Sequence, residues 1–340
     1  MSAVSFENVS IVFGDTPQVA LPLMDEGLER GEIQQKTGQV LGVHDCTLSV
    51  EPGEILVLMG LSGSGKSTLL RAVNGLNPVV RGAVKVKTDR GEVNVTDAKG
   101  EALRHVRRTE IAMVFQQFGL LPWRTVRENV GLGLELAGMS RSDRKAQVDK
   151  QLELVGLSDW ADRKVGELSG GMQQRVGLAR AFVTDAPILL MDEPFSALDP
   201  LIRTRLQDEL LELQERLNRT IIFVSHDLDE AFKLGDRIAI MEGGRIVQWG
   251  TPRDIYSQPA NEYVADFVAH MNPLGVLCAR DVMEPGGQGR ATHMGPDDEI
   301  ADVIQAVLDG AAPVAVVDDG AVIGQVSKTS VLRRISGADD

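Results

Sequence analysis

The sequence predicts an α/β fold built around a largely parallel sheet, on three observations. Short apolar runs such as Pro187–Met191 have the length and composition of strands buried on both faces. Runs of this kind alternate with helical patterns along most of the chain. One run leads directly into a glycine-rich segment at residues 60–65, and a helical pattern follows it. The length of 340 residues also predicts a second, smaller domain, because a single core usually stops growing near ~250–300 residues.

The composition is that of an ordinary globular protein, with 43% hydrophobic and 25% charged residues. There are 35 Lys and Arg against 49 Asp and Glu, and the resulting net charge of −14 argues against nucleic acid as a partner. We find no secretory signal and no run of ~18 apolar residues, so we expect a cytoplasmic protein that reaches a membrane only through a partner. Cys46 and Cys278 stand far apart and are expected to be buried, inert thiols.

Strand-like patterns divide the chain into elements. Residues 3–13 predict one or two edge strands, and residues 23–38 predict a short helix. Thr47–Val50 and Glu54–Met59 flank a Glu-Pro-Gly turn and predict an adjacent or antiparallel pair of strands. Further strands are expected at Ile111–Phe115, Pro187–Met191, Thr220–Ser225 and Arg237–Met241.

Helices are predicted where apolar residues recur at helical spacing. We expect one helix over Lys66–Leu76 and a largely helical region over residues 122–165, where Val148, Leu152 and Val155 share one face. A core-facing amphipathic helix is predicted by the stripe Ile202, Leu206, Leu210, Leu213 and Leu217. Gly and Pro then cluster after residue 272, which predicts two domains, 1–272 and 273–340.

Residues 60–67 read GLSGSGKS, which fits the phosphate-loop pattern G-x-x-x-x-G-K-[ST] in its strand–loop–helix context. The glycines let the backbone curl so that its N–H groups point at a phosphate. Lys66 supplies a charge to the β- and γ-phosphates of ATP, and Ser67 supplies a hydroxyl to Mg²⁺. The ATP-binding residues expected in this loop are Gly60, Ser62, Gly63, Ser64, Gly65, Lys66, Ser67 and Thr68.

A matching acidic element reads ILLMDEP at residues 188–194. Asp192 stands at the C-terminal end of the predicted strand, where α/β sheets place ligands, and is expected to hold Mg²⁺ through water. Glu193 can polarise the attacking water as a general base. An acidic pair after a strand is common, so this pair alone is weak evidence for a nucleotide site. Together with the phosphate loop it is strong evidence.

A third segment, LSGGMQQR at residues 168–175, predicts a second anion site. Ser169, Gly170 and Gly171 open a helix and offer uncapped N–H groups to a phosphate. Both anion sites are used most simply in a homodimer, where this helix caps ATP held by the other subunit. The alternative is an ordinary Ser-Gly-Gly helix start.

These motifs together resemble the ATP-binding cassette (ABC) ATPases over residues ~1–270. The resemblance implies an antiparallel N-terminal β subdomain and a helical signature subdomain near residues 117–168. It implies that Gln116 contacts Mg²⁺ and the water, that His226 contacts the γ-phosphate, and that Asp199 lies in a loop crossing the dimer interface. Met172 stands where the family signature more usually has Gln. Phe13 is where the family places its adenine-stacking aromatic, although the spacing to the phosphate loop is wider than typical and a core role is the alternative.

The widened spacing is also informative about subfamily. Residues 14–45 are similar to the insertion in ATPases of glycine betaine, proline betaine and choline importers. The resemblance implies a subunit that powers quaternary-amine uptake, with choline preferred. It implies a location on the cytoplasmic face of the inner membrane, a membrane permease as partner and an indirect link to a periplasmic binding protein.

The C-terminal residues ~275–337 resemble one cystathionine-β-synthase-type (CBS) module. Asp318-Asp319-Gly320 is expected to turn a hairpin between Val314–Val317 and Ala321–Val326. Adenosine-binding modules have an Asp three residues after a Ser or Thr, whereas here Ser327 is followed by Ser330. The alternatives are therefore a dimerising or vestigial module and a regulatory sensor of ionic strength or nucleotide.

Two other functions are compatible with parts of the sequence. One is a soluble ABC ATPase acting on ribosomes or DNA, which the net charge and the lack of a second cassette or long coiled coil disfavour. The other is a non-enzymatic regulator built on the tail, which the presence of Gln116, Glu193 and His226 disfavours.

Overall fold

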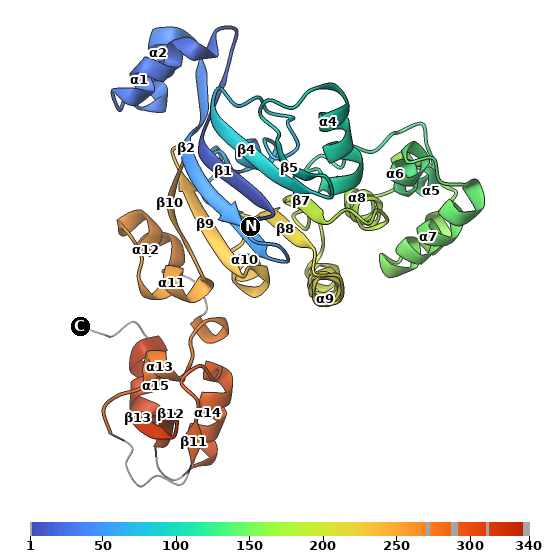
Figure 1. Cartoon of the computed structure of the whole chain (residues 1–340). Coiled ribbons are helices and arrows are strands. Elements are labelled where there is room, and N and C mark those ends of the chain that lie inside the picture. The colour runs from blue at the N-terminus through green and yellow to red at the C-terminus, as the bar shows by residue number, and fades with distance from the viewer. Residues whose placement is uncertain (1, 270–272, 287–291, 311–312, 336–340) are drawn as a thin grey trace. The chain divides into compact units, whose positions relative to one another are not determined.

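The computed structural model describes residues 2–269, 273–286, 292–310 and 313–335. These residues form two compact units, traced from blue to red in Figure 1. The first comprises residues up to 227 together with 234–249, and the second comprises residues 228–233 and the chain from 250 onward. In the described part of the chain, no helix is long and apolar enough to cross a membrane.

The first unit contains a four-stranded sheet in the order β2-β1-β4-β5. Its strands are β1 (Val4–Phe13), β2 (Val40–Val50), β4 (Arg81–Thr88) and β5 (Gly91–Asn94). All of its pairings are antiparallel, and Val4 of β1 lies opposite both Val50 and Val86. The expectation of an edge strand at residues 3–13 was therefore wrong, because β1 hydrogen-bonds to neighbours on both sides.

The same unit contains a six-stranded sheet in the order β10-β9-β3-β8-β7-β6. Its strands are β3 (Ile55–Met59), β6 (Ile111–Val114), β7 (Ile188–Asp192), β8 (Thr220–Val224), β9 (Arg237–Glu242) and β10 (Arg245–Gly250). The pairings β9–β3, β3–β8, β8–β7 and β7–β6 are parallel, as the sequence predicted.

The pairing expected between Thr47–Val50 and Glu54–Met59 was wrong, because these residues belong to different sheets. Every residue of β3 is buried, so it fits the interior of the parallel sheet between β8 and β9. β2 has exposed residues among its buried ones and pairs with β1. The turn at residues 51–54 thus carries the chain from one sheet to the other.

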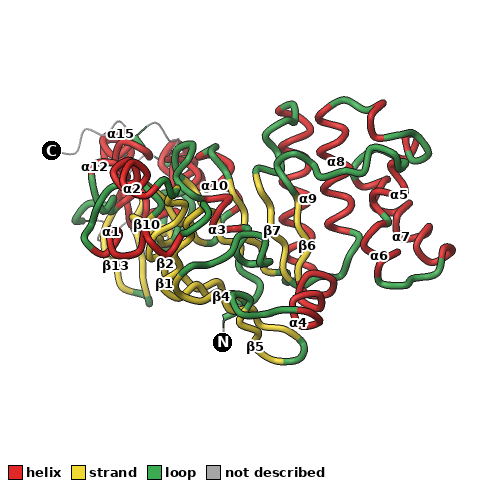
Figure 2. The backbone as a smooth tube through the Cα atoms, turned by 90° about the horizontal axis from the view of Figure 1, so that it is seen from above, coloured by secondary structure: helices red, strands yellow, loops and turns green. Residues whose placement is uncertain are grey.

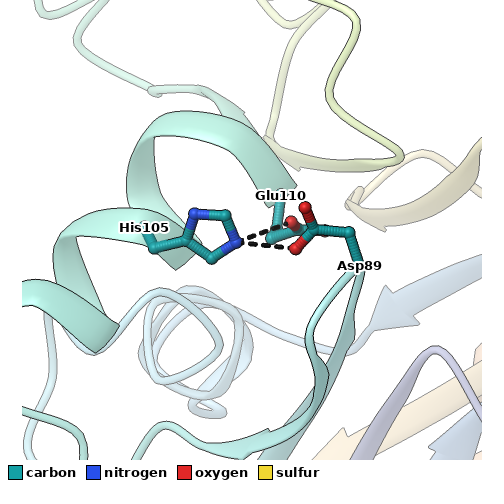
Figure 3. Close-up of side chains that lie close together, drawn as sticks. All are labelled: Asp89, His105 and Glu110. Atoms are coloured by element: carbon teal, nitrogen blue, oxygen red, sulfur yellow. Dashed lines mark hydrogen bonds and ion pairs between the residues drawn. The ribbon is translucent and has the colours of Figure 1, made fainter.

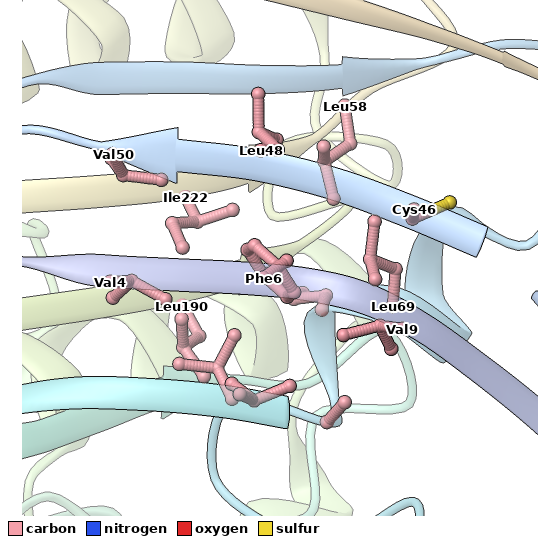
Figure 4. Packing of buried hydrophobic residues seen from close by; sticks show 14 of the residues in the cluster. Val4, Phe6, Val9, Cys46, Leu48, Val50, Leu58, Leu69, Leu190 and Ile222 are labelled. Atoms are coloured by element: carbon pink, nitrogen blue, oxygen red, sulfur yellow. The ribbon is translucent and has the colours of Figure 1, made fainter. Parts of the chain in front are cut away.

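The core of this unit lies between the two sheets (Figure 4). Phe6 of β1 and Leu48 of β2 face Leu58 of β3, Leu190 of β7 and Ile222 of β8, and all are buried. Full burial of a side chain of this size contributes ~1.5–3 kcal/mol. This packing holds fixed the loops that follow the parallel strands.

The helices of the first unit are mostly short, and their bounds are α3 (Lys66–Leu70), α4 (Gly100–His105), α5 (Val126–Val130), α6 (Leu132–Leu136), α7 (Arg141–Leu154), α8 (Gly170–Phe182) and α9 (Pro200–Leu217); α10 (Leu228–Leu234) follows. Helices α5 to α7 gather beside α8, beyond the edge of the parallel sheet (Figures 1 and 2). Val148, Leu152 and Val155 are buried, as predicted for one face.

Two helix predictions need correction. The α-helix that begins at Lys66 ends at Leu70, and turns rather than α-helix continue toward Leu76. In the long stripe Leu206 and Leu210 are buried, but Leu217 is 48% exposed because the helix ends there at a left-handed Asn218. The side chain of Leu213 lies outside the described residues.

Residues 14–39 form a small folded lobe rather than the single helix expected over 23–38. A 3-10 turn leads into α1 (Leu21–Asp25), and α2 (Arg30–Thr37) follows. Gly27, with a φ of +81°, lies between the two helices. The lobe has its own core, formed by Val12, Ala20, Met24, Ile33 and Leu41.

The second unit contains α11 (Pro252–Ser257), α12 (Glu262–Val268), α13 (Ala279–Val282), α14 (Ile300–Asp309) and α15 (Lys328–Ile335), with a sheet in the order β11-β12-β13. Its strands are β11 (His293–Met294), β12 (Val314–Asp318) and β13 (Ala321–Val326). The predicted hairpin is confirmed: β12 and β13 pair antiparallel, and Asp319 and Gly320 between them have positive φ.

The domain boundary expected near residue 272 falls on residues 270–272, outside the described part of the chain. Tyr256 of α11 packs against the core that includes Ile300 and Val314. This contact explains why residues from 250 onward group with the C-terminal segment. The CBS-type resemblance and the division at 272 stay predictions.

Candidate nucleotide site

The loop between β3 and α3 has a conformation that glycine makes accessible. Gly60, Gly63 and Gly65 have φ values of +135°, +79° and +104°. A Cβ at Gly60 would lie 2.1 Å from the carbonyl oxygen of Met241, and one at Gly65 would lie 2.7 Å from that of Gly42. The backbone thus curls tightly against its neighbours, as the phosphate-loop pattern predicted.

Lys66, at the start of α3, is hydrogen-bonded to the loop and lies near the carboxylates of Asp192 and Glu193. Lys66 Nζ donates to the carbonyl oxygens of Gly60 (2.7 Å) and Leu61 (2.9 Å). Burial lowers the pKa of Lys66, while the carboxylates of Glu193 and Asp192 oppose that shift. The lysine is therefore held near the loop with two negative groups close by.

Asp192 is completely buried and has a partner on each oxygen. Ser67 Oγ donates to Asp192 Oδ1 at 2.6 Å, and Arg71 Nη2 donates to Oδ2 at 2.7 Å. Charge-assisted hydrogen bonds of this length offset the cost of burying a carboxylate. The pair expected to bind Mg²⁺, Ser67 and Asp192, is thus already in contact.

Three residues meet where neighbouring strands end. Gln116 follows β6, Glu193 follows β7, and His226 follows β8. Gln116 Nε2 donates to Glu193 Oε2 at 3.3 Å, and His226 Nδ1 lies 3.5 Å from the same oxygen. Glu193 has a φ of +49°, an uncommon conformation for this residue type that is found preferentially at functional sites.

A cavity of about 600 Å³ lies above these residues. This volume is within the range of small-molecule sites. Its lining includes most of the residues that the sequence assigned to ATP, namely Phe13, Ser62, Gly63, Gly65, Lys66, Ser67, Thr68, Gln116, Glu193 and His226. Phe13 is 37% exposed, which leaves part of its ring accessible for stacking.

Comparison with known proteins identifies the family. Residues 43–196 match the model described as ABC transporter. ProV of Escherichia coli K12, a glycine betaine/proline betaine transport system ATP-binding protein, is 48% identical over 291 residues, which are 85% of this chain and 72% of ProV. TmoW of Ruegeria pomeroyi, a trimethylamine N-oxide transport system ATP-binding protein, is 41% identical over 97% of this chain and 96% of TmoW. The chain belongs to the ABC transporter ATP-binding subunits.

The ATP-binding subunit is also similar to a solved dimer, the post-hydrolysis state of the ATP-binding cassette MJ0796 bound to ADP and Pi. The TM-score is 0.63 at 30% identity, over 74% of this chain and 99% of the cassette. The protein is thus an ABC-type ATPase coupled to transport, with the cassette fold.

The signature segment of this ATP-binding subunit lies apart from the cavity. Ser169 caps α8, accepting a hydrogen bond from the Met172 N–H at 3.4 Å, and Ser169 and Gly170 are exposed. Neither these residues nor Gly171 is part of the cavity lining. Asp199 likewise caps α9, accepting from the Ile202 N–H at 3.1 Å. One chain therefore does not bring its two predicted anion sites together.

The structure adds functional candidates that sequence reasoning missed. Arg71 lies four residues after Ser67, and both side chains reach Asp192, so helical spacing was an available signal. Gln174 Nε2 donates to the Glu193 carbonyl and its Oε1 accepts from the Ala197 N–H, both at 3.0 Å. Arg30 also lines the cavity, and no sequence motif pointed to it.

The residues present fit ATP and Mg²⁺. The loop curls through three glycines with positive φ, and the buried hydroxyl of Ser64 has no hydrogen-bond partner among the described residues. The ammonium group of Lys66 donates hydrogen bonds to two loop carbonyls, and a phosphate can replace these carbonyls as the acceptor. Ser67 and Asp192 supply the hydroxyl and carboxylate oxygens that Mg²⁺ prefers.

A second ionisable cluster contains Asp89, His105 and Glu110 (Figure 3). None of the three lines the cavity. His105 Nε2 lies 2.8 Å from Asp89 Oδ1 and 3.2 Å from Glu110 Oε1. Ligand atoms around a tetrahedral zinc ion at ~2.0 Å are separated by ~3.3 Å, so the shorter contact is that of a hydrogen bond. The hydrogen bond from His105 lowers the pKa of Asp89. We interpret the cluster as a hydrogen-bonded group of side chains.

Proposed function

We propose that this ATP-binding subunit powers the import of a small solute that carries a methylated polar nitrogen, with glycine betaine as the leading candidate. The observation that carries the proposal is the extent of the similarity to ProV and TmoW, which are named for betaines and for trimethylamine N-oxide. These solutes share a methylated nitrogen and a polar or charged oxygen. Choline, the solute preferred from the insertion, belongs to the same chemical class and is included in the test.

Trimethylamine N-oxide is the second candidate. TmoW aligns with 97% of this chain, and the match therefore extends into the C-terminal unit. The match to ProV extends over 85% of the chain. The full-length match favours a TmoW-like system, whereas the higher identity favours a ProV-like one.

The proposal includes the partners that such a transporter needs. The subunit acts at the cytoplasmic face of the inner membrane, as a homodimer bound to an integral permease. A periplasmic binding protein delivers the solute to that permease. The solute never contacts this subunit, so the residues that line the cavity do not identify the solute. Gln116 and the helices α5 to α7 are the parts assigned to transmit closure of the ATP site to the permease.

In the proposed mechanism the reaction is phosphoryl transfer from ATP to water. The phosphate loop and Lys66 bind the triphosphate and hold its charge. Ser67, Asp192 and Gln116 would hold Mg²⁺, directly or through water, and the ion would supply positive charge to offset that of the triphosphate. Glu193 polarises the attacking water, and His226 contacts the γ-phosphate. The hydrogen bond from Gln174 to the Glu193 carbonyl restrains the left-handed backbone of that residue, and the hydrogen bond from Gln116 orients its carboxylate.

The functional unit in this proposal is a dimer with two shared ATP sites. Each ATP lies between the residues 60–68 of one chain and the residues 169–171 of its twin. The separation of these segments within one chain supports this arrangement. So does the similarity to a cassette that was solved as a dimer.

Reconstitution of the subunit with its permease and binding protein in lipid vesicles tests the function. Uptake of labelled glycine betaine, trimethylamine N-oxide and choline is measured with and without ATP inside. We expect ATP-dependent uptake of at least one of them and its loss in Glu193→Gln. ATP hydrolysis that none of the three solutes stimulates would contradict the substrate class. Failure to co-purify with any permease would instead favour the soluble ATPase.

A further inference from the structure

We propose that Arg30, which the lobe of residues 14–39 contributes, is a further positioning residue of the ATP site. The proposal rests on the function above, because it assumes that the phosphate loop binds ATP. Its guanidinium braces the glycine-rich loop and adds a second positive charge to the cavity lining that contains Lys66. The lobe thereby acquires a role in nucleotide binding.

The contacts of Arg30 link the phosphate loop to strand β2. Its Nη1 donates to the carbonyl oxygen of Gly63 at 2.5 Å, and its Nη2 donates to that of Gly42 on β2. A Cβ at Gly244 would lie 2.9 Å from the same Nη2. The buried Nε has no hydrogen-bond partner among the described residues. The side chain is thus half-buried against the backbone of the loop, of β2 and of Gly244.

The loop needs such a brace at Gly63. Nothing lies within 4 Å of a Cβ built there, so side-chain packing does not restrain this residue. The peptide unit between Gly63 and Ser64 is instead held by hydrogen bonds at both ends. The Ser64 N–H donates to the Leu61 carbonyl at 3.1 Å, and the Gly63 carbonyl accepts from Arg30. Fixing this peptide lowers the entropy that the loop loses when it orders around a phosphate.

Arg30 stands on a rigid support. It is the first residue of α2, where Glu29 and Glu32 form a capping box. Ile33 of the same helix packs in the lobe's core against Val12 and Leu41, which belong to β1 and β2. The guanidinium is therefore held in place before nucleotide arrives, which is the condition for a positioning residue to be effective.

The charge of Arg30 also complements the ligand. The cavity lining contains the carboxylate of Glu193, and Lys66 and Arg30 are the fixed cations among the lining residues that the structure describes. A triphosphate with its Mg²⁺ remains anionic. Loss of Arg30 leaves Lys66 as the single fixed cation of the described lining, so both the brace and the favourable field are weakened.

The experiment measures binding of a fluorescent ATP analogue to the purified chain, with Mg²⁺, in a Glu193→Gln background that blocks turnover. We expect Arg30→Ala to raise the dissociation constant ~10-fold, the effect of losing hydrogen bonds from a charged group. In the wild-type background KM for ATP should rise similarly, while kcat at saturating ATP stays within about twofold. A residue that only stabilised the fold would not produce this split.

Two variants control for charge and for folding. Lys36→Ala removes an exposed cation from the same helix, and it should leave ATP binding unchanged. Arg30→Lys keeps the charge but not the fork that reaches two carbonyls, so it should recover only part of the affinity. Melting temperatures without nucleotide show which variants are folded.

The outcomes separate this inference from the proposed function. If the Glu193→Gln protein binds no ATP, the proposed site itself is wrong. If it binds ATP and Lys66→Ala weakens that binding, but Arg30→Ala binds as tightly as the parent, the inference on Arg30 is overturned. It is also overturned if Lys36→Ala loses as much affinity as Arg30→Ala. Should Arg30→Ala not fold, full parental affinity of Arg30→Lys would contradict the brace.

Discussion

The adjacent carboxylates of Asp192 and Glu193 have different surroundings in this site. The two oxygens of Asp192 bond to Ser67 and Arg71, so one side of the carboxylate is available for exchange with a metal while the other stays paired. Glu193, the next residue, has a left-handed backbone and faces the cavity instead. Two adjacent carboxylates thus have different environments, and we assign them different roles, metal binding and polarisation of water.

The residue-scale prediction concerns Glu193→Gln. The substitution keeps the size of the side chain and removes its basicity. We expect ATP turnover to fall ~10²–10³-fold, because losing one positioned catalytic group typically has that effect. ATP binding, measured by equilibrium fluorescence, should be retained. Lys66→Ala is the contrasting control and should lose affinity as well as turnover. Near-normal hydrolysis by the glutamine variant would remove Glu193 from the mechanism.

Among the elements, α11 and α13 show how the second unit is tied together. Arg253 of α11 bonds to Asp281 of α13 at 2.6 Å, and the Cys278 N–H donates to the same carboxylate at 3.0 Å. Burial alone would raise the pKa of Asp281, but these hydrogen bonds outweigh it and lower the pKa below its usual value. The carboxylate is therefore more acidic in the folded than in the unfolded chain.

A pH dependence follows from that direction. A lowered pKa contributes stability that is fully present above the unfolded value, near 3.8, and is lost as pH falls through the folded value. We expect Arg253→Met to lower the stability of the second unit by ~1–3 kcal/mol at pH 7. The difference between variant and wild type should shrink below about pH 4. Thermal unfolding of the full chain at pH 7 and pH 3 measures this, and an equal difference at both would contradict it.

On the scale of the whole molecule, the two separated anion sites are the reason why we propose that a twin chain completes the ATP site. The cavity contains the phosphate loop, whereas Ser169 and Gly170 open α8 on an exposed surface outside its lining. In the proposed dimer, closure of two chains around ATP would bring the two sites together and couple hydrolysis to movement of the chains. This is the arrangement that a transport ATPase needs.

Gly170→Asp tests the dimer. The position has no neighbour within 4 Å of a built Cβ, and a carboxylate in the first turn favours the helix itself. The same charge repels the triphosphate on the twin chain. We expect ATP binding by the single chain to persist, while the ATP-dependent dimer and hydrolysis are lost. Size-exclusion chromatography with Mg²⁺ and ATP measures the dimer in the Glu193→Gln background, and hydrolysis is measured in the wild-type background. Gly166→Asp, equally open, is the matched control. Normal dimerisation of the Gly170 variant would refute the shared site.

The sequence by itself determined the phosphate loop, the parallel core strands and the C-terminal hairpin. Each depends on contiguous residues, so local spacing carries the information. Only the tertiary structure decided which sheet β2 and β3 join, because the turn between them suits either choice. It also decided that Arg30 and Arg71 reach the site, and that Gln116, Glu193 and His226 meet. Those three are far apart along the chain and become neighbours through the order β6-β7-β8, which long-range packing sets and no local pattern encodes.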